Sequence, residues 1–439
     1  SRLTAGDTLN IRGGTYYERP TASVSGTASA PITIQSYSGE QVVIDSGGPE
    51  FRTPGNSDWE LVNASLGEYR SVASFSSGQI AAYVDGIPGY YNERVGLVPY
   101  TTAAAFRSTS EVYVDGSTPF YIGPGTFRDS DSRIHIRLAK TQDMRDVESR
   151  YGTIFPTENA DPRAYGIILS NASDTLAVSG SYLTFKNITF NQALQTITLS
   201  TGTNNVIFDG ITAWFGNRTI SVTGSGVYNI TIRNSRIYGD IPLWIAWSDA
   251  KDPPAPADLW RGTSINLASG ARDVTISYSH IRGGHDGIGM NTDEKNVTLH
   301  HNRIENFADD CFEIEGTTNI GRIEMYENYF ANCLDMLSVG QDSAAITGPV
   351  LLYRNIASFL RNPYVNRKDG INTWNGGGKY GYEYMFKQGG GNLTGNIHYT
   401  HNTFVMLNTG SGNGMNFGRM TVPSGSTLAN NVAVMGVGK

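Results

Sequence analysis

An alternating pattern of apolar residues recurs along the middle of this chain. It is clearest in the segments "RDVTISYSHIRGG", "KNVTLHHNRIENF" and "GRIEMYENYFANC". Val274, Val297 and Ile323 hold its first apolar position, 23 and 26 residues apart. Apolar residues at every second position indicate short β-strands. A unit of this size without a helix cannot bury its apolar face alone, so it must stack on its neighbours. We therefore predict an all-β solenoid, a parallel β-helix.

A polar position of the repeat supports this stacking. Asn302, Asn328 and Asn402 share one position in the repeat. Neighbouring strands in a sheet lie about 4.8 Å apart, close enough for stacked Asn amides to bond along a column. Asn also tolerates the left-handed backbone conformation of turns. The sequence leaves both explanations open.

The chain divides into three regions by pattern. Residues 1–50 are rich in strand and Gly signals and read as the first turns of the β-helix. Residues 51–160 break the period with segments such as "EVYVDGSTPF" and "SRIHIRL", which read as antiparallel hairpins and predict an inserted β-subdomain or elaborated loops. Residues 161–439 form the main β-helix, and we expect a cap or further domain beyond their end.

Composition excludes several classes of function. Charged residues make up 17% of the 439 residues and the net charge is −7, so we expect no general nucleic-acid binding. No apolar run approaches the ~20 residues of a membrane span. We expect a mature monomer, extracellular or periplasmic, from which a signal peptide has been removed.

Two cysteines, Cys311 and Cys333, lie about one repeat apart. Their spacing does not match a zinc site. A disulfide between neighbouring turns is geometrically possible, but free cysteines are commonly buried as small apolar residues. We therefore favour two buried free thiols.

The segments that follow each repeat carry an acidic column. They read "QTITL", "RTISV", "TSINL", "DGIGM", "DCFEI" and "DMLSV", with apolar residues at the third and fifth positions. The leading position holds Asp286, Asp310 and Asp335 in three consecutive members. We predict that these aspartates stack at one edge of one sheet. Asp309 and Glu313 have the opposite strand parity and are expected to point outward.

Carboxyl groups at this spacing indicate acid–base chemistry. Like charges close together raise one another's pKa values and can hold a proton near neutrality. Residues one or two turns apart lie ~5 or ~10 Å apart, which spans the carboxyl separations of retaining and inverting glycosidases. A calcium site, or aspartates that cap turns, are the structural alternatives. Hydrolysis by carboxyl groups requires no cofactor or metal.

Residues flanking this sheet are candidates for binding a sugar. Aromatic faces stack on sugar rings, basic groups pair with acidic sugars, and a histidine beside a carboxylate can exchange protons. Glu313 is a further candidate. The other candidate substrate-binding residues are Trp244, Trp247, Trp260, Trp374, Arg367, Lys368 and His285.

The repeats and acidic turns resemble the pectate-lyase-like superfamily of right-handed parallel β-helices. "DGIGMNTDEKNVTLHHNRIENFADDCFEI" is similar to the stretch of polygalacturonases (glycoside hydrolase family 28) between their Asn-Thr-Asp and Asp-Asp motifs. The resemblance places Asp286 in the first motif and Asp309 and Asp310 in the second. It implies an inverting hydrolase in which Asp309 is the general acid and the other two activate water.

The chain departs from that family in two places. "CLDMLSVG" puts Asp335 where the family has the histidine of Gly-His-Gly, and the Arg-x-Lys motif has no clear counterpart. The N-terminal stretch "AGDTLNIRGGTYYER" resembles polysaccharide lyase family 6 and glycoside hydrolase family 141-like proteins instead. The resemblance therefore indicates the superfamily rather than a polygalacturonase.

Three functions fit these observations. The first is a secreted glycoside hydrolase that cleaves a polysaccharide or oligosaccharide with paired carboxylates. The second is a polysaccharide lyase, in which the acidic patch binds calcium and a basic residue removes a proton. The third is a glycan-binding fibre of the tailspike type, because the fold alone does not set the function.

Overall fold

The computed structural model describes most of the chain. The described residues are 3–75, 81–87, 94–111, 118–214, 216–239, 241–245, 262–315, 319–333, 335–339, 345–359, 373–374, 377–378, 387–388, 392–408 and 423–437. Side chains at the ends of some of these segments are not described.

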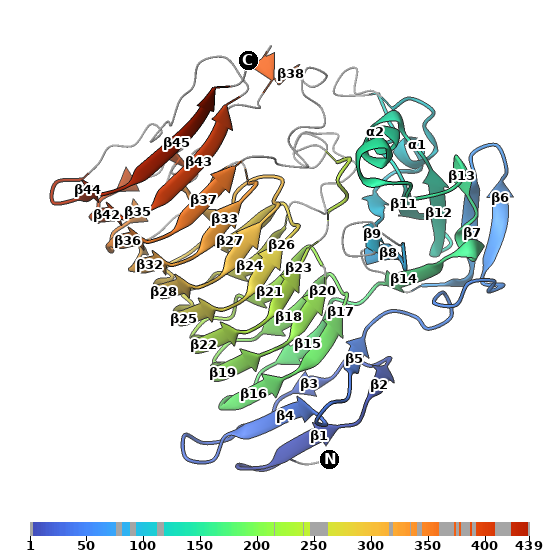
Figure 1. The fold of residues 1–439 in the computed structure, drawn as a ribbon. Coiled ribbons are helices and arrows are strands. Elements are labelled where there is room, and N and C mark those ends of the chain that lie inside the picture. Colours follow the sequence, from blue (N-terminus) through green and yellow to red (C-terminus); the bar gives the residue numbers. More distant parts are fainter. Residues whose placement is uncertain are drawn as a thin grey trace.

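Three long parallel sheets wrap around one axis to form the coil (Figure 1). The first sheet contains β1 (Thr8–Ile11), β4 (Ile32–Ser36), β16 (Leu183–Lys186), β19 (Asn204–Asp209), β22 (Tyr228–Arg233), β25 (Arg272–Ser277), β28 (Lys295–His300), β32 (Ile323–Tyr326), β36 (Val350–Tyr353), β42 (Ile397–Thr400) and β44 (Thr427–Ala429). The second contains β2 (Gly14–Tyr16), β5 (Val42–Asp45), β17 (Ile188–Asn191), β20 (Thr212–Trp214), β23 (Arg236–Tyr238), β26 (His280–Arg282), β29 (Arg303–Glu305), β33 (Tyr329–Ala331), β37 (Ile356–Phe359), β43 (Thr403–Asn408) and β45 (Val432–Val437). The third contains β3 (Thr21–Ala22), β15 (Asp174–Val178), β18 (Gln195–Leu199), β21 (Arg218–Val222), β24 (Thr263–Leu267), β27 (Asp286–Met290), β30 (Phe312–Ile314), β34 (Ser338–Val339) and β40 (Lys387–Gln388).

Smaller sheets complete the fold. A three-stranded parallel sheet joins β31 (Asn319–Ile320), β35 (Ala345–Ile346) and β41 (Asn392–Leu393), and a short antiparallel pair joins β38 (Thr373–Trp374) to β39 (Gly377–Gly378). None of the helices in the described part of the chain is long and apolar enough to span a bilayer.

Stacked aliphatic side chains hold the coil together. Ile230, Val274, Val297 and Ile323 are consecutive partners in the first sheet, and all are fully buried. Each such side chain contributes about 1.5–3 kcal/mol by leaving water. Because the apolar residues repeat once per turn, the same contact is made at every level, which explains the periodicity of the sequence.

The predicted asparagine column is confirmed, and it is longer than predicted. The Asn302 amide donates to Asn328 Oδ1, and the Asn328 amide donates to Asn355 Oδ1, each at 3.0 Å. Asn355 and Asn402 continue the pattern upward to Asn431. The backbone N–H of each residue also donates to the amide oxygen of the next, so the buried amides satisfy one another and the corner backbone.

The alternative explanation for these asparagines is wrong. Left-handed backbone occurs at the residue before the ladder position, as at His301 (φ 56°), Glu327 (φ 54°) and His401 (φ 59°). The ladder asparagines themselves are selected by hydrogen bonding along the column. The residues directly before them adopt the left-handed backbone conformation of the turn.

An inserted subdomain separates β5 from β15. It is built from β6 (Trp59–Asn63), β7 (Glu68–Ser74), β8 (Ala81–Asp85), β9 (Arg94–Gly96), β10 (Val98–Tyr100), β11 (Gly125–Arg128), β12 (Arg133–Ala139), β13 (Asn159–Ala160) and β14 (Gly166–Ser170). Its sheets are largely antiparallel. Helices α1 (Ala103–Arg107) and α2 (Gln142–Tyr151) and a 3-10 turn (Pro162–Ala164) cover them, which the strand signals did not predict.

The subdomain packs against the side of the coil. The Arg94 guanidinium lies over the Trp214 ring at 4.2 Å, and the Tyr83 hydroxyl donates to the Gly239 carbonyl at 3.3 Å. Ile241 and Leu243, which follow β23, belong to the apolar core of the subdomain rather than to that of the coil. The insertion is therefore anchored by charge, aromatic and apolar contacts.

The cysteines form a disulfide, so the favoured prediction of free thiols is wrong. Cys311 and Cys333 have Cα atoms 5.5 Å apart in neighbouring turns, and both side chains face the core. The stacking of turns places the pair within bonding reach. The sequence separation of about one repeat was the relevant signal.

Candidate active site

Strand register brings the acidic residues together as predicted. Thr263 pairs with Asp286. Ile288 pairs with Phe312, and each lies two residues after an aspartate, so Asp286 and Asp310 are aligned on neighbouring turns. The Asp310 N–H donates to Asp286 Oδ1 at 3.1 Å, and the Cys311 N–H donates to the Asp335 carbonyl at 2.8 Å. Asp286, Asp310 and Asp335 thus occupy one edge of the third sheet on consecutive turns.

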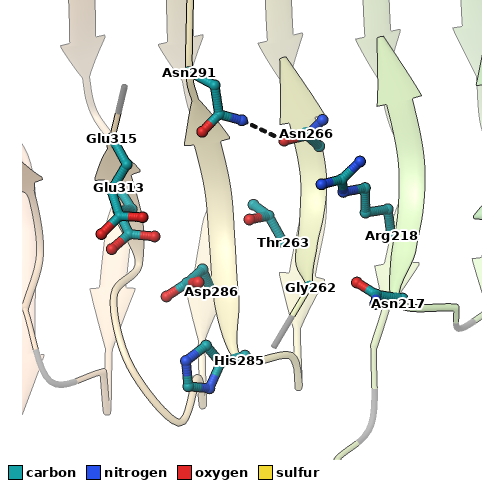
Figure 2. A pocket seen from close by; sticks show the side chains of 10 residues that line it. All are labelled: Asn217, Arg218, Gly262, Thr263, Asn266, His285, Asp286, Asn291, Glu313 and Glu315. Atoms are coloured by element: carbon teal, nitrogen blue, oxygen red, sulfur yellow. Dashed lines mark hydrogen bonds between the residues drawn. The ribbon is translucent and has the colours of Figure 1, made fainter. Parts of the chain in front are cut away.

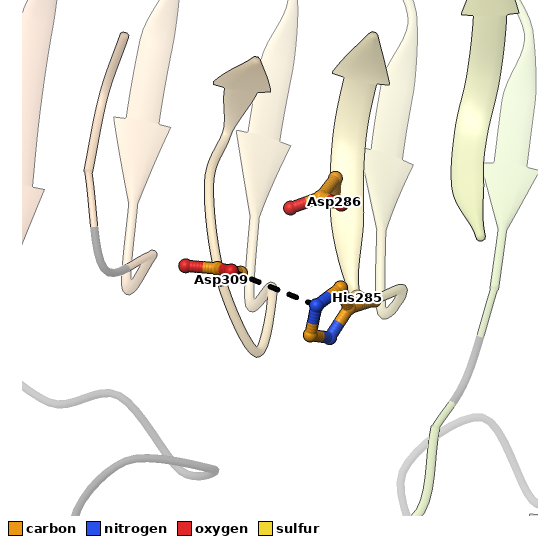
Figure 3. A group of neighbouring side chains, drawn as sticks. All are labelled: His285, Asp286 and Asp309. Carbon is orange, nitrogen blue, oxygen red and sulfur yellow. Dashed lines mark ion pairs between the residues drawn. The ribbon is translucent and has the colours of Figure 1, made fainter. Parts of the chain in front are cut away.

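Strand parity, which predicted an outward direction for Asp309, does not apply to this residue, and its side chain is buried. The strand begins only at Phe312, so Asp309 and Asp310 lie in the preceding corner, where strict alternation does not apply. Asp309 is 1% exposed, its N–H donates to the His285 carbonyl, and its Oδ2 lies 3.6 Å from His285 Nε2 (Figure 3). Asp310 and Asp335 are fully buried.

Glu313 does lie on the outer side of its strand, between core residues Phe312 and Ile314. It borders a pocket rather than open solvent and is 9% exposed. Gly289, its register partner in β27, has no side chain to compete for this space. Burial and the charges of Asp286, Asp310 and Asp309 raise the pKa of Glu313 well above its ordinary value.

The pocket has a volume of about 320 Å³ and runs over β21, β24, β27 and β30 (Figure 2). Its walls are almost entirely polar. They are formed by Asn217, Arg218, Gly262, Thr263, Asn266, His285, Asp286, Asn291, Glu313 and Glu315. Asp286 and Glu313 are the two members of the acidic cluster that reach the pocket, whereas Asp309, Asp310 and Asp335 lie behind them. A cavity of this size accepts a sugar unit with its hydroxyls hydrogen-bonded.

Arg218 is a pocket residue that sequence reasoning missed. It opens "RTISV" and occupies the same leading position as Asp286, two strands away across Thr263. Among the described residues, no lysine and no other arginine lines the pocket. Its place in the column is visible in the sequence, where the aspartates of the later segments carry the stronger signal.

Two overlapping groups of side chains have the geometry of metal ligands. In the first, one oxygen each of Asp286, Asp310 and Glu313 lie within 4.8 Å of one another. In the second, one ring nitrogen of His285 and one oxygen each of Asp286 and Asp309 lie within 4.8 Å of one another. The all-oxygen group suits calcium, which prefers carboxylates in flexible arrangements.

The predicted role of Trp244 as a sugar platform is wrong. Its side chain is fully buried in the core of the inserted subdomain. A Cβ placed on Gly123 would lie 2.4 Å from Trp244 Nε1, so the indole fits directly against that glycine. An aromatic ring at a loop was read as exposed, but the subdomain covers it.

Of the other predicted binding residues, the structure describes the side chain of His285 alone. His285 lines the pocket and is 2% exposed. Trp247, Trp260, Arg367 and Lys368 lie outside the described residues. Trp374 is described only by its backbone in β38, and its side-chain role stays a prediction, as does that of His285.

Comparison with known proteins agrees with this architecture. A family model described as "Right handed beta helix region" matches residues 165–382. The chain folds as a right-handed parallel β-helix. The structure titled "The complex structure of XylC with xylose" superimposes with a TM-score of 0.55 at 16% identity, covering 91% of this chain and 65% of that one. A structure titled "Glycoside hydrolase" superimposes with a TM-score of 0.51 at 11% identity, covering 98% and 88%.

One curated relative matches a short part of this β-helix. It is "Pectate lyase PEL9" from Emericella nidulans, 48% identical over 71 residues. The match covers 15% of this chain and 16% of the length of that relative. The local identity is high, and the rest of the two chains is not aligned by it.

Proposed function

We propose that this β-helix is an enzyme that acts on carbohydrate, and specifically a glycoside hydrolase whose catalytic pair is Asp286 and Glu313. The observation that carries the proposal is that these carboxyl groups face one polar pocket and that Glu313 has a strongly raised pKa. A carboxylic acid kept protonated near neutrality beside a carboxylate is the arrangement that glycosidic cleavage uses.

The roles follow from the environments. Glu313 donates its proton to the glycosidic oxygen as the bond to the leaving group breaks, and the Asp286 carboxylate attacks the anomeric carbon. Water that transfers a proton to the deprotonated Glu313 then releases the sugar from Asp286. Their nearest oxygens lie within 4.8 Å, closer to the ~5–5.5 Å of retaining enzymes than to the ~6.5–9.5 Å of inverting ones. This pairing replaces the inverting scheme implied by polygalacturonases. Asp309 and Asp310 act from behind, since their charges help to keep Glu313 protonated.

The pocket supports a polysaccharide or oligosaccharide as substrate. Asn266 and Asn291, which are hydrogen-bonded to each other at 2.8 Å, present amide groups to sugar hydroxyls beside Arg218. The fold-level likeness to a xylose complex and to a glycoside hydrolase supports the same class. The disulfide favours an oxidising compartment, so we propose an extracellular or periplasmic monomer.

The test is a panel of polysaccharides and oligosaccharides read by the release of reducing ends. Asp286→Asn and Glu313→Gln should each lower kcat by 10³-fold or more, roughly the contribution of acid–base and nucleophilic groups. Asp273→Asn, at an exposed site on the outer face of β25, is the matched control. Retained turnover in both pocket variants would exclude this mechanism, and binding without turnover in the wild type would favour a glycan-binding fibre.

A second candidate, a calcium-assisted polysaccharide lyase, is favoured by the all-oxygen cluster and by the local match to a pectate lyase. Asp286, Asp310 and Glu313 would hold the ion, which would neutralise a uronate carboxylate.

The two candidates require different states of Glu313. A proton donor cannot at the same time be a calcium ligand. The hydrolase should be insensitive to a calcium chelator and should form no unsaturated product that absorbs in the ultraviolet, as proton abstraction by a lyase would. Loss of activity with chelator together with such absorbance would select the lyase.

A further inference from the structure

Two adjacent histidines at the end of β28 lie on an outer corner of the coil, outside the acidic pocket. His300 Nδ1 and His301 Nδ1 are 3.0 Å apart. In an extended strand, neighbouring side chains point to opposite faces. His301 instead has φ 56°, in the left-handed region, and this turn brings both imidazoles to the same side.

Aromatic neighbours hold each imidazole in place. His300 stacks on Tyr326 with ring centres 4.9 Å apart and planes 7° apart, and Tyr326 stacks on Tyr353. His301 stacks on Tyr278 with ring centres 4.7 Å apart. The rings therefore lose little freedom when a ligand binds between their nitrogens, which is the advantage of a preorganised site.

A carboxylate fixes the chemistry of His301. Its Nε2 lies 2.8 Å from Glu327 Oε2, and Glu327 also pairs with Arg354 at 3.3 Å. An Nε2–H that donates to this carboxylate leaves the lone pair on Nδ1. Histidines that bind metals commonly donate their other N–H to a carboxylate in this way.

We propose that His300 and His301 form a two-imidazole chelate for a divalent transition ion, with Cu²⁺ bound most tightly. Two nitrogen ligands at bond lengths of about 2.0 Å are separated by about 2.9 Å in a square-planar site and by about 3.3 Å in a tetrahedral one. The observed 3.0 Å lies in this range. Imidazole ligands and the usual order of affinities favour Cu²⁺ over Ni²⁺ and Zn²⁺. Water completes the coordination, since 38% of the His301 side chain is exposed.

The competing explanation is a hydrogen bond from one Nδ1–H to the other Nδ1. It accounts for the distance equally well. The hydrogen-bond explanation does not depend on the contact between His301 Nε2–H and the Glu327 carboxylate, and it predicts no affinity for metal. The two explanations are therefore separated by measuring binding directly, with no reference to the proposed enzyme activity.

The experiment is titration of tag-free protein with Cu²⁺ at pH 7.5, by calorimetry and by electron paramagnetic resonance. We expect one site with nitrogen coordination that His300→Ala or His301→Ala weakens by more than tenfold. Glu327→Gln, which keeps both imidazoles, should weaken it by about tenfold. His401→Ala is the matched control because His401 occupies the same left-handed corner position three turns further along.

Each outcome of the titration either supports or overturns the proposed copper site. Copper binding that is unchanged in His300→Ala and His301→Ala, or lost equally in His401→Ala, overturns the proposal and leaves a hydrogen bond only. Binding that disappears in Asp286→Asn instead would assign the ion to the acidic pocket and also overturn it. Thermal melts of each variant confirm that the coil is intact.

Discussion

Glu294 offers a quantitative test of how this solenoid buries charge. It lies in the turn between β27 and β28 and is fully buried. Its Oε2 accepts the Thr292 N–H at 2.7 Å, whereas Oε1 is buried with no hydrogen-bond partner among the described residues. Burial outweighs the backbone donors and raises the pKa of Glu294 from 4.5 to about 7.

The sign and size of the effect follow from this pKa. The folded state holds the proton over a range in which the unfolded state has already lost it, so stability falls as pH rises from 4.5 to about 7. A difference of about 2.5 units at 1.36 kcal/mol per unit gives a loss of about 3 kcal/mol. Below the unfolded pKa the contribution is fully present, and above pH 7 the loss is complete and constant.

Glu294→Gln removes the titration while keeping the shape and the acceptor for Thr292. We expect the variant to match the wild type near pH 4.5 and to exceed its stability by up to about 3 kcal/mol above pH 7. The assay is denaturant unfolding followed by circular dichroism at half-unit steps of pH, with Asp273→Asn as the control for removing one exposed carboxylate. Stability curves of wild type and Glu294→Gln that stay parallel from pH 4.5 to 8 would refute the reasoning.

Three further predictions concern the frame around the site. Asn328→Leu breaks the ladder at its middle and removes the four hydrogen bonds that the Asn328 side chain makes. This should destabilise the coil by about 4 kcal/mol, measured as a lower Tm; an unchanged Tm would contradict the account. Replacing Cys311 and Cys333 by Ser removes a crosslink between residues 22 apart in sequence, and the free energy of unfolding should fall by about 3 kcal/mol. Reductant should lower the stability of the wild type by the same amount and should not affect the variant. Gly123→Ala places a methyl group against Trp244 at a backbone φ of 136°, so the inserted subdomain should lose about 2 kcal/mol or more and become sensitive to protease before the coil does.

Sequence reasoning was reliable wherever the repeat itself carried the information. The stacking of Asp286, Asp310 and Asp335, and the asparagine column, follow from counting residues, because one turn of the coil corresponds to one period. Asn355, in the repeat segment "LYRNIA", belongs to the same column and extends it beyond the three predicted residues.

Prediction failed where a residue lies outside a strand or contacts a distant segment. Asp309 precedes its strand, so parity does not report the direction of its side chain, which is buried. Trp244 is covered by a subdomain more than 100 residues earlier in the chain, and no local pattern reports such a contact. Arg218 belonged to the aligned column but was read as an ordinary strand residue, because a lone arginine carries no pattern of its own.

The proposed catalytic pair is divided between neighbouring coils, with Asp286 on β27 and Glu313 on β30. A duplication or deletion of one coil would preserve the shape of the solenoid, because every level makes the same contacts. It would nonetheless separate or erase the pair in a single genetic event. Relatives with the same scaffold can therefore lose, regain or exchange their chemistry through changes in coil number, without any substitution at the reacting residues themselves.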